Sequence, residues 1–238
     1  MLLVLVALLA APAALARDGA GGDRAAHLAP LARVSVVGSG PIAWANVAVR
    51  SAPRRDAAVV ARLTQFRPDY RPRTILALDE RQNAAGQATW YRVSVPGRPN
   101  GRTGWIPAAA ASVAPVDRWL VVYRGSRKFE LYVNGRLRRT GPIAVGAPGM
   151  ETPLGLYYVT VRFKPIKEPF LGAFAFETSA YSKLSDWPGG GVVGLHGWND
   201  PSVLGKAISH GCIRVSNVTA AFLRDRIPVG TPIRVVAT

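Results

Sequence analysis

Short runs of β-forming residues follow one another along most of the chain, and turn-forming residues separate each run from the next. Short strands with turns between them are typical of small barrels and packed sheets. The clearest runs, which are rich in aliphatic and aromatic residues, cover residues 34–37, 73–78, 89–93, 119–123 and 129–133. A helical pattern is visible only over residues 218–227, where Asn217 is a suitable N-cap. The sequence therefore predicts a mainly β protein with one or two short helices.

The length and composition fit a globular chain with two units. The chain has 238 residues, of which 49% are hydrophobic and 18% charged, and this composition excludes a disordered protein. A run of small residues from Pro107 to Pro115 has the composition of a linker. We therefore expect one β-rich unit over residues 32–114 and a second over residues 116–238.

A long irregular loop is expected in the second unit. Residues 162–190 contain three prolines, Pro165, Pro169 and Pro188, and show no clear periodicity. Loops of this length are often functional. The segment therefore either borders a binding groove or is an ordinary surface connection.

The N-terminal residues 1–16 resemble a secretory signal peptide. Residues 2–9 are entirely apolar, and Ala14 and Ala16 stand at the two positions that a signal peptidase reads. The apolar run is too short to span a bilayer. No lysine or arginine precedes it, so an uncleaved anchor stays open as the alternative. We expect an exported protein of the periplasm or cell wall, with residues 17–31 as a flexible leader.

The chain is strongly basic. It has 30 lysine and arginine residues against 14 aspartate and glutamate residues, which gives a net charge of +16. Such a charge attracts polyanions, among them nucleic acid and an anionic cell wall. The expected export disfavours nucleic acid and favours anionic cell-wall polymers as partners. A solvated, arginine-rich surface without a specific partner is the alternative.

The only cysteine and two of the three histidines lie in one stretch near the C-terminus. His196 is followed by a glycine, and Cys212 ends the run Ser-His-Gly-Cys. A thiol with an ordinary pKa of about 8.5 is mostly protonated at neutral pH, and an imidazole can remove its proton to give the nucleophilic thiolate. The pattern therefore indicates nucleophilic catalysis, with Cys212 as the nucleophile and His196 as its base.

The residues around Cys212 fit this chemistry better than a metal site. Gly211 allows a tight turn in which backbone N–H groups stabilise an oxyanion. Arg214 adds a positive charge that either orients a carboxylate or supports the turn. His196, His210 and Cys212 are zinc-ligand types, but their spacing matches no common zinc pattern and a fourth ligand is missing. We expect no metal and no other cofactor.

These motifs resemble the signature of the L,D-transpeptidases, the YkuD-type catalytic domain. That signature is a His-Gly, a spacer, and Ser-His-Gly-Cys followed by an apolar residue and an arginine. The resemblance extends over residues 116–236 and includes a Thr-Pro-x-Gly-x-aromatic segment at residues 152–157. It implies that Cys212 is the nucleophile, that His196 donates and accepts the proton, and that the Gly197 carbonyl orients the imidazole.

The same resemblance implies roles for the flanking residues. Ser209 and His210 shape the nucleophile turn together with Gly211. We assign Arg214, Trp198 and Asn217 to substrate binding. Trp198 departs from the family pattern, since many members have a small or hydroxyl residue after His-Gly, and this departure implies an altered substrate groove.

The family resemblance implies a peptidoglycan L,D-transpeptidase acting on stem peptides. In the family's reaction the thiolate attacks the carbonyl of the third stem residue, D-alanine leaves, and an amine of a neighbouring stem resolves the thioester. Two alternatives stay open: an L,D-carboxypeptidase that uses the same acyl-enzyme, and a catalytically inert wall-binding protein. A papain-like hydrolase is disfavoured because those enzymes place the cysteine before the histidine, and no histidine follows Cys212.

The first unit resembles a bacterial SH3-like domain. The matching pieces are residues 49–53, 90–93 and 104–106. The resemblance implies a small SH3-like barrel that binds peptide or glycan parts of the cell wall. Trp90 and Trp105 either contribute to that binding or fill the barrel core.

Overall fold

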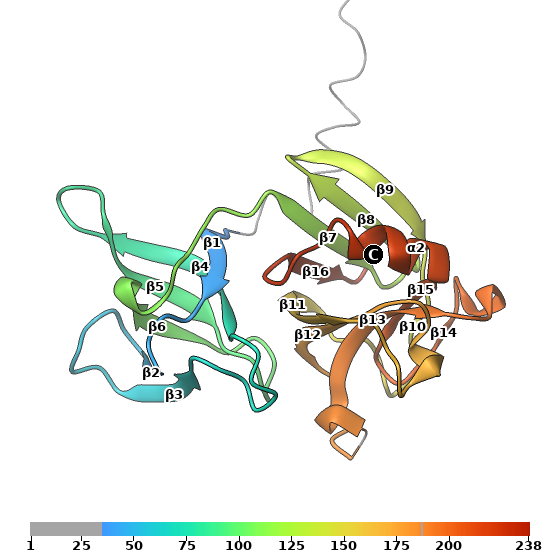
Figure 1. Ribbon diagram of the computed structural model, residues 1–238, viewed down its shortest axis with the longest axis horizontal. Coiled ribbons are helices and arrows are strands. Elements are labelled where there is room, and N and C mark those ends of the chain that lie inside the picture. Colours follow the sequence, from blue (N-terminus) through green and yellow to red (C-terminus); the bar gives the residue numbers. More distant parts are fainter. Residues whose placement is uncertain (1–34, 187) are drawn as a thin grey trace, which may run out of the picture.

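The computed structural model describes residues 35–238 with the exception of residue 187 (Figure 1). The predicted signal peptide and leader, residues 1–16 and 17–31, lie outside the described residues. The described chain is mainly β, as predicted, and its two large sheets lie side by side in Figure 1. None of the described helices is both long and apolar enough to cross a membrane.

Six antiparallel strands form the N-terminal unit. They are β1 (Gly38–Pro41), β2 (Asn46–Arg50), β3 (Val59–Thr64), β4 (Thr74–Gln82), β5 (Ala88–Ser94) and β6 (Thr103–Pro107). The strand order is β1–β4–β5–β6–β2–β3, and all neighbouring pairs are antiparallel. Alternate residues point to one face and form a small core, in which Val49, Ile75, Val93 and Ile106 are fully buried.

The predicted linker packs against this first sheet. Its first residues form a short 3-10 helix, η1 (Ala108–Ala110), whose last residue is fully buried. Its end pairs with β1 through Ser39 and Ala114. Gly40 permits this approach, because a Cβ there would lie 1.7 Å from the carbonyl oxygen of Ser112. The assignment of this unit to an SH3-like barrel stays a prediction.

Eight strands form the larger sheet of the second unit. They are β7 (Arg118–Tyr123), β8 (Lys128–Val133), β9 (Arg136–Pro142), β11 (Gly155–Phe163), β12 (Ala175–Tyr181), β13 (Val192–Trp198), β15 (Ile213–Ser216) and β16 (Pro232–Val236). Their order is β15–β13–β12–β11–β16–β7–β8–β9. The β13–β15 and β7–β16 pairs are parallel and the others antiparallel. Two short strands, β10 (Val145–Gly146) and β14 (Ala207–Ser209), form a separate parallel pair.

The expectation of an irregular segment over residues 162–190 was wrong in part, because the segment contains β12. This strand pairs with β11 on one side and β13 on the other, so its backbone groups are satisfied within the sheet. Short 3-10 helices, η2 (Pro169–Leu171) and η3 (Pro188–Gly191), flank the strand. Loops therefore remain on both sides of β12, and a further 3-10 helix, η4 (Pro201–Val203), follows β13.

The predicted helix is α2 (Asn217–Arg224), and its N-cap differs from the prediction. The cap is Ser216, whose Oγ accepts a hydrogen bond from the Thr219 backbone N–H at 3.1 Å. Asn217 is instead the first helical residue, and its side chain is free for contacts outside the helix. Buried Ala220 and Leu223 attach α2 to the core of the second unit.

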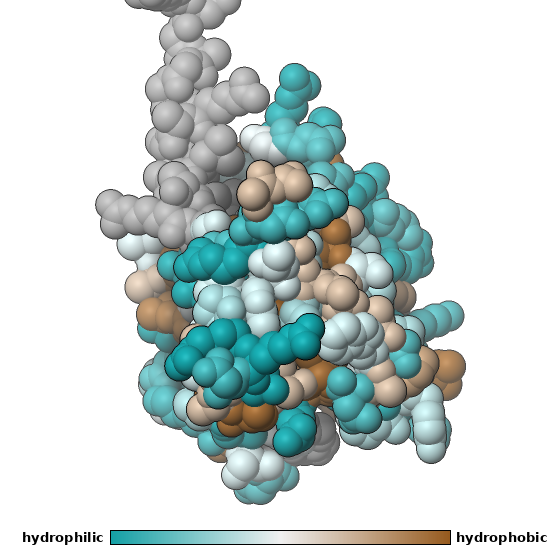
Figure 2. Space-filling view, turned by 90° about the vertical axis from the view of Figure 1, so that its left-hand side faces the viewer, coloured by the Kyte–Doolittle hydropathy of each residue, from teal (hydrophilic) through white to brown (hydrophobic). Residues whose placement is uncertain are grey.

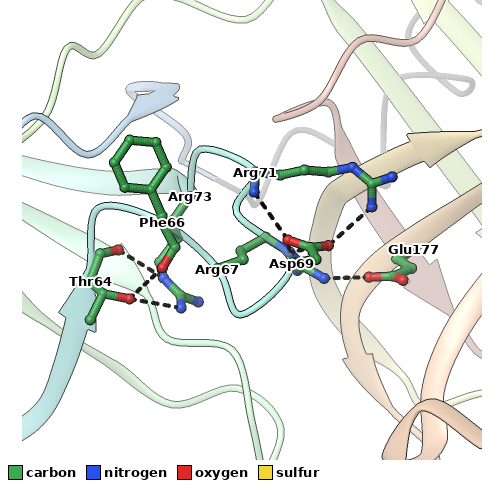
Figure 3. A network of polar contacts seen from close by, with 7 residues as sticks. All are labelled: Thr64, Phe66, Arg67, Asp69, Arg71, Arg73 and Glu177. Carbon is green, nitrogen blue, oxygen red and sulfur yellow. Dashed lines mark hydrogen bonds and ion pairs between the residues drawn. The ribbon is translucent and has the colours of Figure 1, made fainter.

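A loop of the N-terminal unit reaches the second sheet through charged side chains. Arg67, between β3 and β4, places Nη2 at 2.6 Å from Oε2 of Glu177 on β12 (Figure 3). Asp69 contacts Arg67 at 3.4 Å and Arg71 at 3.0 Å on the same loop. These side chains are partly exposed, so each pair is expected to contribute about 1 kcal/mol or less to stability.

A second contact between the units uses the main chain of β12. Asn100, in the loop between β5 and β6, donates from Nδ2 to the carbonyl oxygen of Tyr181 at 2.7 Å. Its Oδ1 accepts a hydrogen bond from the Tyr181 backbone N–H at 2.9 Å. The side-chain amide thus pairs with both backbone groups of Tyr181, at the end of β12, as a neighbouring strand would.

We predict that Asn100→Ala lowers the free energy of unfolding. The change leaves the backbone N–H and carbonyl of Tyr181 without their partners, and an unsatisfied group of this kind costs about 1–3 kcal/mol. Urea titration of the full chain measures the effect. Asn46→Ala is the control, because Asn46 is exposed and makes no side-chain hydrogen bond to any other described residue. Equal stability of the two variants would contradict the prediction.

Candidate active site

Two adjoining strands bring Cys212 and His196 together. Strands β13 and β15 are parallel, with His196 paired to Arg214, and Cys212 stands directly before β15. The backbone N–H of Gly194 donates to Cys212 Sγ at 3.3 Å. A Cβ placed at Gly194 would lie 3.7 Å from Cys212 Sγ and 3.7 Å from His196 Cδ2, so sulfur and imidazole border the same small space. The sequence placed Gly194 at the start of the catalytic stretch but indicated no role for it.

A single hydrogen bond fixes the tautomer of His196. Its Nδ1 lies 2.7 Å from the carbonyl oxygen of Gly197, as the resemblance implied. A carbonyl oxygen only accepts hydrogen bonds, so Nδ1 carries the proton and Nε2 is left as the base. The side chain is 3% exposed, and this burial lowers the histidine pKa to about 4. The imidazole is therefore neutral at neutral pH.

Burial also keeps Cys212 protonated. Loss of solvent raises the pKa of the thiol, while the Gly194 N–H and the positive charge of Arg214 oppose this effect. The resting pair is therefore a neutral thiol beside a neutral imidazole. Proton transfer from sulfur to Nε2 then has to accompany the attack on a substrate.

A network of hydrogen bonds holds the turn that precedes Cys212. Ser209 Oγ donates to the carbonyl oxygen of Cys212 at 2.6 Å and accepts from the Gly211 N–H at 3.2 Å. Thr152 Oγ1 donates to the Gly211 carbonyl at 2.8 Å and accepts from the Gly146 N–H at 3.0 Å. Ser209 and Thr152 are both fully buried, so neither side chain has water as an alternative partner. The family resemblance implied that Ser209 shapes this turn. Thr152 was identified only as part of the Thr-Pro-x-Gly-x-aromatic segment, without a role in the turn.

Gly211 meets two separate requirements of this turn. Its φ of +115° lies in the region that favours glycine. A Cβ at this position would also lie 2.8 Å from Cβ of Ser182, in the loop that follows β12. Both conformation and space therefore exclude a side chain beside the nucleophile.

The sulfur and imidazole open into a pocket of 300 Å³. Its lining combines the reactive pair with aromatic, aliphatic and cationic side chains: Phe170, Leu171, His196, Trp198, His210, Cys212 and Arg214. The guanidinium of Arg214 lies 3.7 Å from the centre of the Trp198 ring. Trp198 and Arg214, which we assigned to substrate binding, thus form one wall. Phe170 and Leu171 come from the loop before β12, and the sequence did not single them out.

Asn217 does not line this pocket. Its Oδ1 accepts a hydrogen bond from the Ala173 N–H at 2.8 Å, and its Nδ2 donates to Asn199 Oδ1 at 2.8 Å. Asn217 therefore anchors the loop that carries Phe170, and this contact does not correspond to the substrate binding expected of it. Among residues 35–238, leaving out residue 187, no cluster of His, Cys, Asp and Glu has the composition to hold a metal ion.

Comparison with known proteins gives a family model, curated relatives and solved structures that resemble this chain. The YkuD family model, described as the L,D-transpeptidase catalytic domain, matches residues 117–235. A Bacillus subtilis protein provisionally named L,D-transpeptidase YkuD is 29% identical over 174 residues, which are 73% of this chain and 92% of that protein. L,D-transpeptidase 1 of Mycobacterium tuberculosis is 31% identical over 118 residues, or 45% of this chain and 46% of that protein. A crystal structure of M. tuberculosis L,D-transpeptidase 3 with a faropenem-derived adduct is 14% identical, has a TM-score of 0.46, and aligns over 84% of this chain and 97% of that one.

We predict that Gly211→Ala is more destabilising than Gly205→Ala. Gly205 also has a positive φ, of +85°, but a Cβ there would meet nothing within 4 Å. Both changes carry the conformational penalty of about 1–2 kcal/mol. Only Gly211→Ala adds a clash with Ser182. Overpacking of this kind lowers the free energy of unfolding by about 1–3 kcal/mol more. Urea titration of both variants measures the difference in the free energy of unfolding. Equal free energies would show that the turn can shift to relieve the clash.

We also predict the pH dependence of Cys212 alkylation by iodoacetamide. Because the thiol pKa is raised, the thiolate fraction and the rate increase about tenfold for each pH unit through the neutral range. Arg214→Gln removes a charge that lowers this pKa, so the variant reacts more slowly at each neutral pH. Stopped-time alkylation with intact-protein mass spectrometry measures both rates. A rate that is flat between about pH 6 and pH 8 would instead indicate a preformed thiolate–imidazolium pair.

Proposed function

The chain belongs to the YkuD family of L,D-transpeptidase catalytic domains, and we propose that it cross-links peptidoglycan stem peptides through a thioester on Cys212. The observation that carries the proposal is the position of Cys212 beside His196, in a pocket large enough for part of a peptide. Family membership supports an action on peptidoglycan and hence a location outside the cytoplasm. The export of this particular chain is part of the proposal.

The first half of the proposed reaction forms the thioester. His196 Nε2 takes the thiol proton as Cys212 Sγ attacks the carbonyl carbon of the third stem residue. The C–N bond to the terminal D-alanine then breaks, and the departing amine takes the proton from Nε2. The Nδ1–H of His196 remains bonded to the Gly197 carbonyl, so the imidazole keeps its orientation throughout.

The second half resolves the thioester. An amine of a second stem peptide attacks the thioester carbonyl and gives its proton to His196 Nε2. The C–S bond breaks, and the proton returns to the sulfur. One amide is exchanged for another, so the reaction requires no metal and no ATP. Water in place of the amine would give the L,D-carboxypeptidase reaction by the same steps.

Arg214 and Trp198 are proposed to hold the donor peptide. Arg214 supplies a positive charge at the pocket wall, and a guanidinium fits a peptide carboxylate. Its plane is supported by the Trp198 ring at 3.7 Å, which limits its motion. His210 lines the same pocket, and we propose a structural role for it in the turn rather than a proton-transfer role.

We propose that the N-terminal unit, as an SH3-like domain, attaches the enzyme to the wall. Figure 2 shows the side of the molecule on which this unit lies, where hydrophobic and strongly hydrophilic residues are mixed. Trp44, which is 44% exposed, and partly exposed Trp90 line a surface hollow of 580 Å³ together with Arg50 and Arg55. Aromatic and cationic side chains together suit anionic glycans. Trp105 is 8% exposed and contributes to the interior instead.

The test is incubation of the purified chain with a stem tetrapeptide. We expect D-alanine release and peptide dimers from the wild type, and neither product from Cys212→Ala, because the thioester needs the sulfur. Mass spectrometry of the products measures both. Tripeptide without dimers would replace the cross-linking function by carboxypeptidase action, and absence of both products would favour an inert wall-binding protein.

Acylation by a β-lactam provides an independent check of the nucleophile. The related M. tuberculosis L,D-transpeptidase 3 carries a faropenem-derived adduct. We expect faropenem to add to the wild type and to Arg138→Gln, an exposed change on β9, but not to Cys212→Ala. An equal mass increase in Cys212→Ala would contradict the assignment of Cys212.

A further inference from the structure

A second and larger cavity lies where the two units meet. It has a volume of 840 Å³ and shares no lining residue with the pocket of Cys212. Its walls come from the β5–β6 loop of the N-terminal unit and from three segments of the second unit, which follow β7, precede β11 and follow β12. Nothing in the donor half of the reaction uses this space.

The N-terminal unit fixes one wall of the cavity in place. Arg98 donates from Nη1 to the carbonyl oxygen of Gly190 at 2.9 Å. Its Nη2 donates to the carbonyl oxygens of Ser182 at 2.9 Å and Leu184 at 2.8 Å. The guanidinium also lies 5.0 Å from the centre of the Tyr181 ring. With the Asn100 contact to Tyr181, these bonds hold the loop after β12, so this wall is already formed without a ligand.

The cavity is positively charged. Arg98, Arg124 and Lys183 line it, against a single carboxylate, Glu151, which pairs with Lys183 at 2.9 Å. Arg124 donates from Nη1 to the carbonyl oxygen of Thr152 at 3.0 Å. No carboxylate of the described residues lies within ion-pair distance of Arg124, so the rest of its guanidinium can bind an anion. A planar guanidinium is suited to a carboxylate, which it binds through two parallel hydrogen bonds.

The cavity also touches the nucleophile turn. Ser182 lines it, and its Cβ would lie only 2.8 Å from a Cβ at residue 211. Glu151 and Pro153 line it on either side of Thr152, whose hydroxyl donates to the Gly211 carbonyl. Two walls of the cavity therefore contact the residue directly before Cys212. A peptide bound there therefore lies close to the turn that carries the sulfur.

We propose that this cavity binds the second peptide of the transfer, an acidic peptide whose carboxylate pairs with Arg124 and Lys183. The inference rests on the proposed function for the identity of the peptide, but the binding itself does not need catalysis. The second peptide has to approach while the donor occupies the pocket of Cys212, and a separate charged cavity beside the turn meets that requirement. The N-terminal unit is then part of the acceptor site through Arg98 and Asn100.

A binding titration on the full chain tests the proposal directly. The probe is a stem tripeptide with free carboxylates, titrated by calorimetry into Cys212→Ala, which cannot react. We expect binding that weakens about tenfold when Arg124→Gln and Lys183→Gln are added, because two charge-assisted contacts are lost. The matched control adds Arg136→Gln and Arg138→Gln instead. These changes remove two charges from β9, an edge strand of the eight-stranded sheet. They should leave the affinity within about twofold of that of Cys212→Ala alone.

Three further measurements separate this proposal from its alternatives. Amidated tripeptide should bind the Cys212→Ala chain more weakly than the free acid, and the difference should disappear in the variant with Arg124→Gln and Lys183→Gln. With Cys212 restored, that double variant should form fewer dimers but should still be acylated by faropenem. Tripeptide should still bind after faropenem has filled the pocket of Cys212.

Two outcomes would overturn the proposal: loss of tripeptide binding after acylation, or equal affinity of the variant with Arg124→Gln and Lys183→Gln and the variant with Arg136→Gln and Arg138→Gln. Absence of acylation alone would overturn only the proposed function.

Discussion

The parallel pairing of β13 with β15 is the interaction on which the site depends. Successive side chains of a strand point to opposite faces, so a shift of one residue would turn every side chain to the wrong side. Leu195 and Ile213 are paired and fully buried or nearly so, and they fix the register by filling the core. Their neighbours His196 and Cys212 are consequently directed to the opposite face, where they meet. The apolar core and the reactive pair are thus two results of one register.

The same burial sets the electrostatics of the pair. Removal from water disfavours charge on either group, so it raises the thiol pKa and lowers the imidazole pKa. The charge of Arg214 lowers the pKa of both groups, so it does not favour a thiolate–imidazolium pair between Cys212 and His196. Its charge stabilises a thiolate on Cys212 but opposes an imidazolium on His196. The site therefore keeps both groups neutral until a substrate carbonyl is present to receive the electrons of the sulfur.

The sequence predicted the parts of this architecture that are encoded locally. The β character, the helix after Ser216 and the cluster around Cys212 are visible as short patterns, and the structure brings His196 and Cys212 to one pocket. Strand β12 was missed because nearby prolines suggested a loop, and only its pairing with β11 and β13 makes it a strand. Asn217 resembled an N-cap, but Ser216 takes that position one residue earlier. The contacts of Asn100 with Tyr181 span 81 residues of sequence, a separation that no local pattern reports.

The junction of the two units is connected to the nucleophile turn through Ser182. Arg98 of the first unit holds the Ser182 carbonyl, and the Ser182 side chain fills the space that a side chain at Gly211 would need. Thr152 fixes the other side of Gly211 through its hydroxyl. The turn before Cys212 is therefore held between a segment of its own unit and a loop that the neighbouring unit positions. Because packed interiors resist small displacements, a shift of Ser182 toward Gly211 would disturb this turn. The N-terminal unit thus supports the nucleophile turn through the hydrogen bonds that Arg98 donates to the loop after β12.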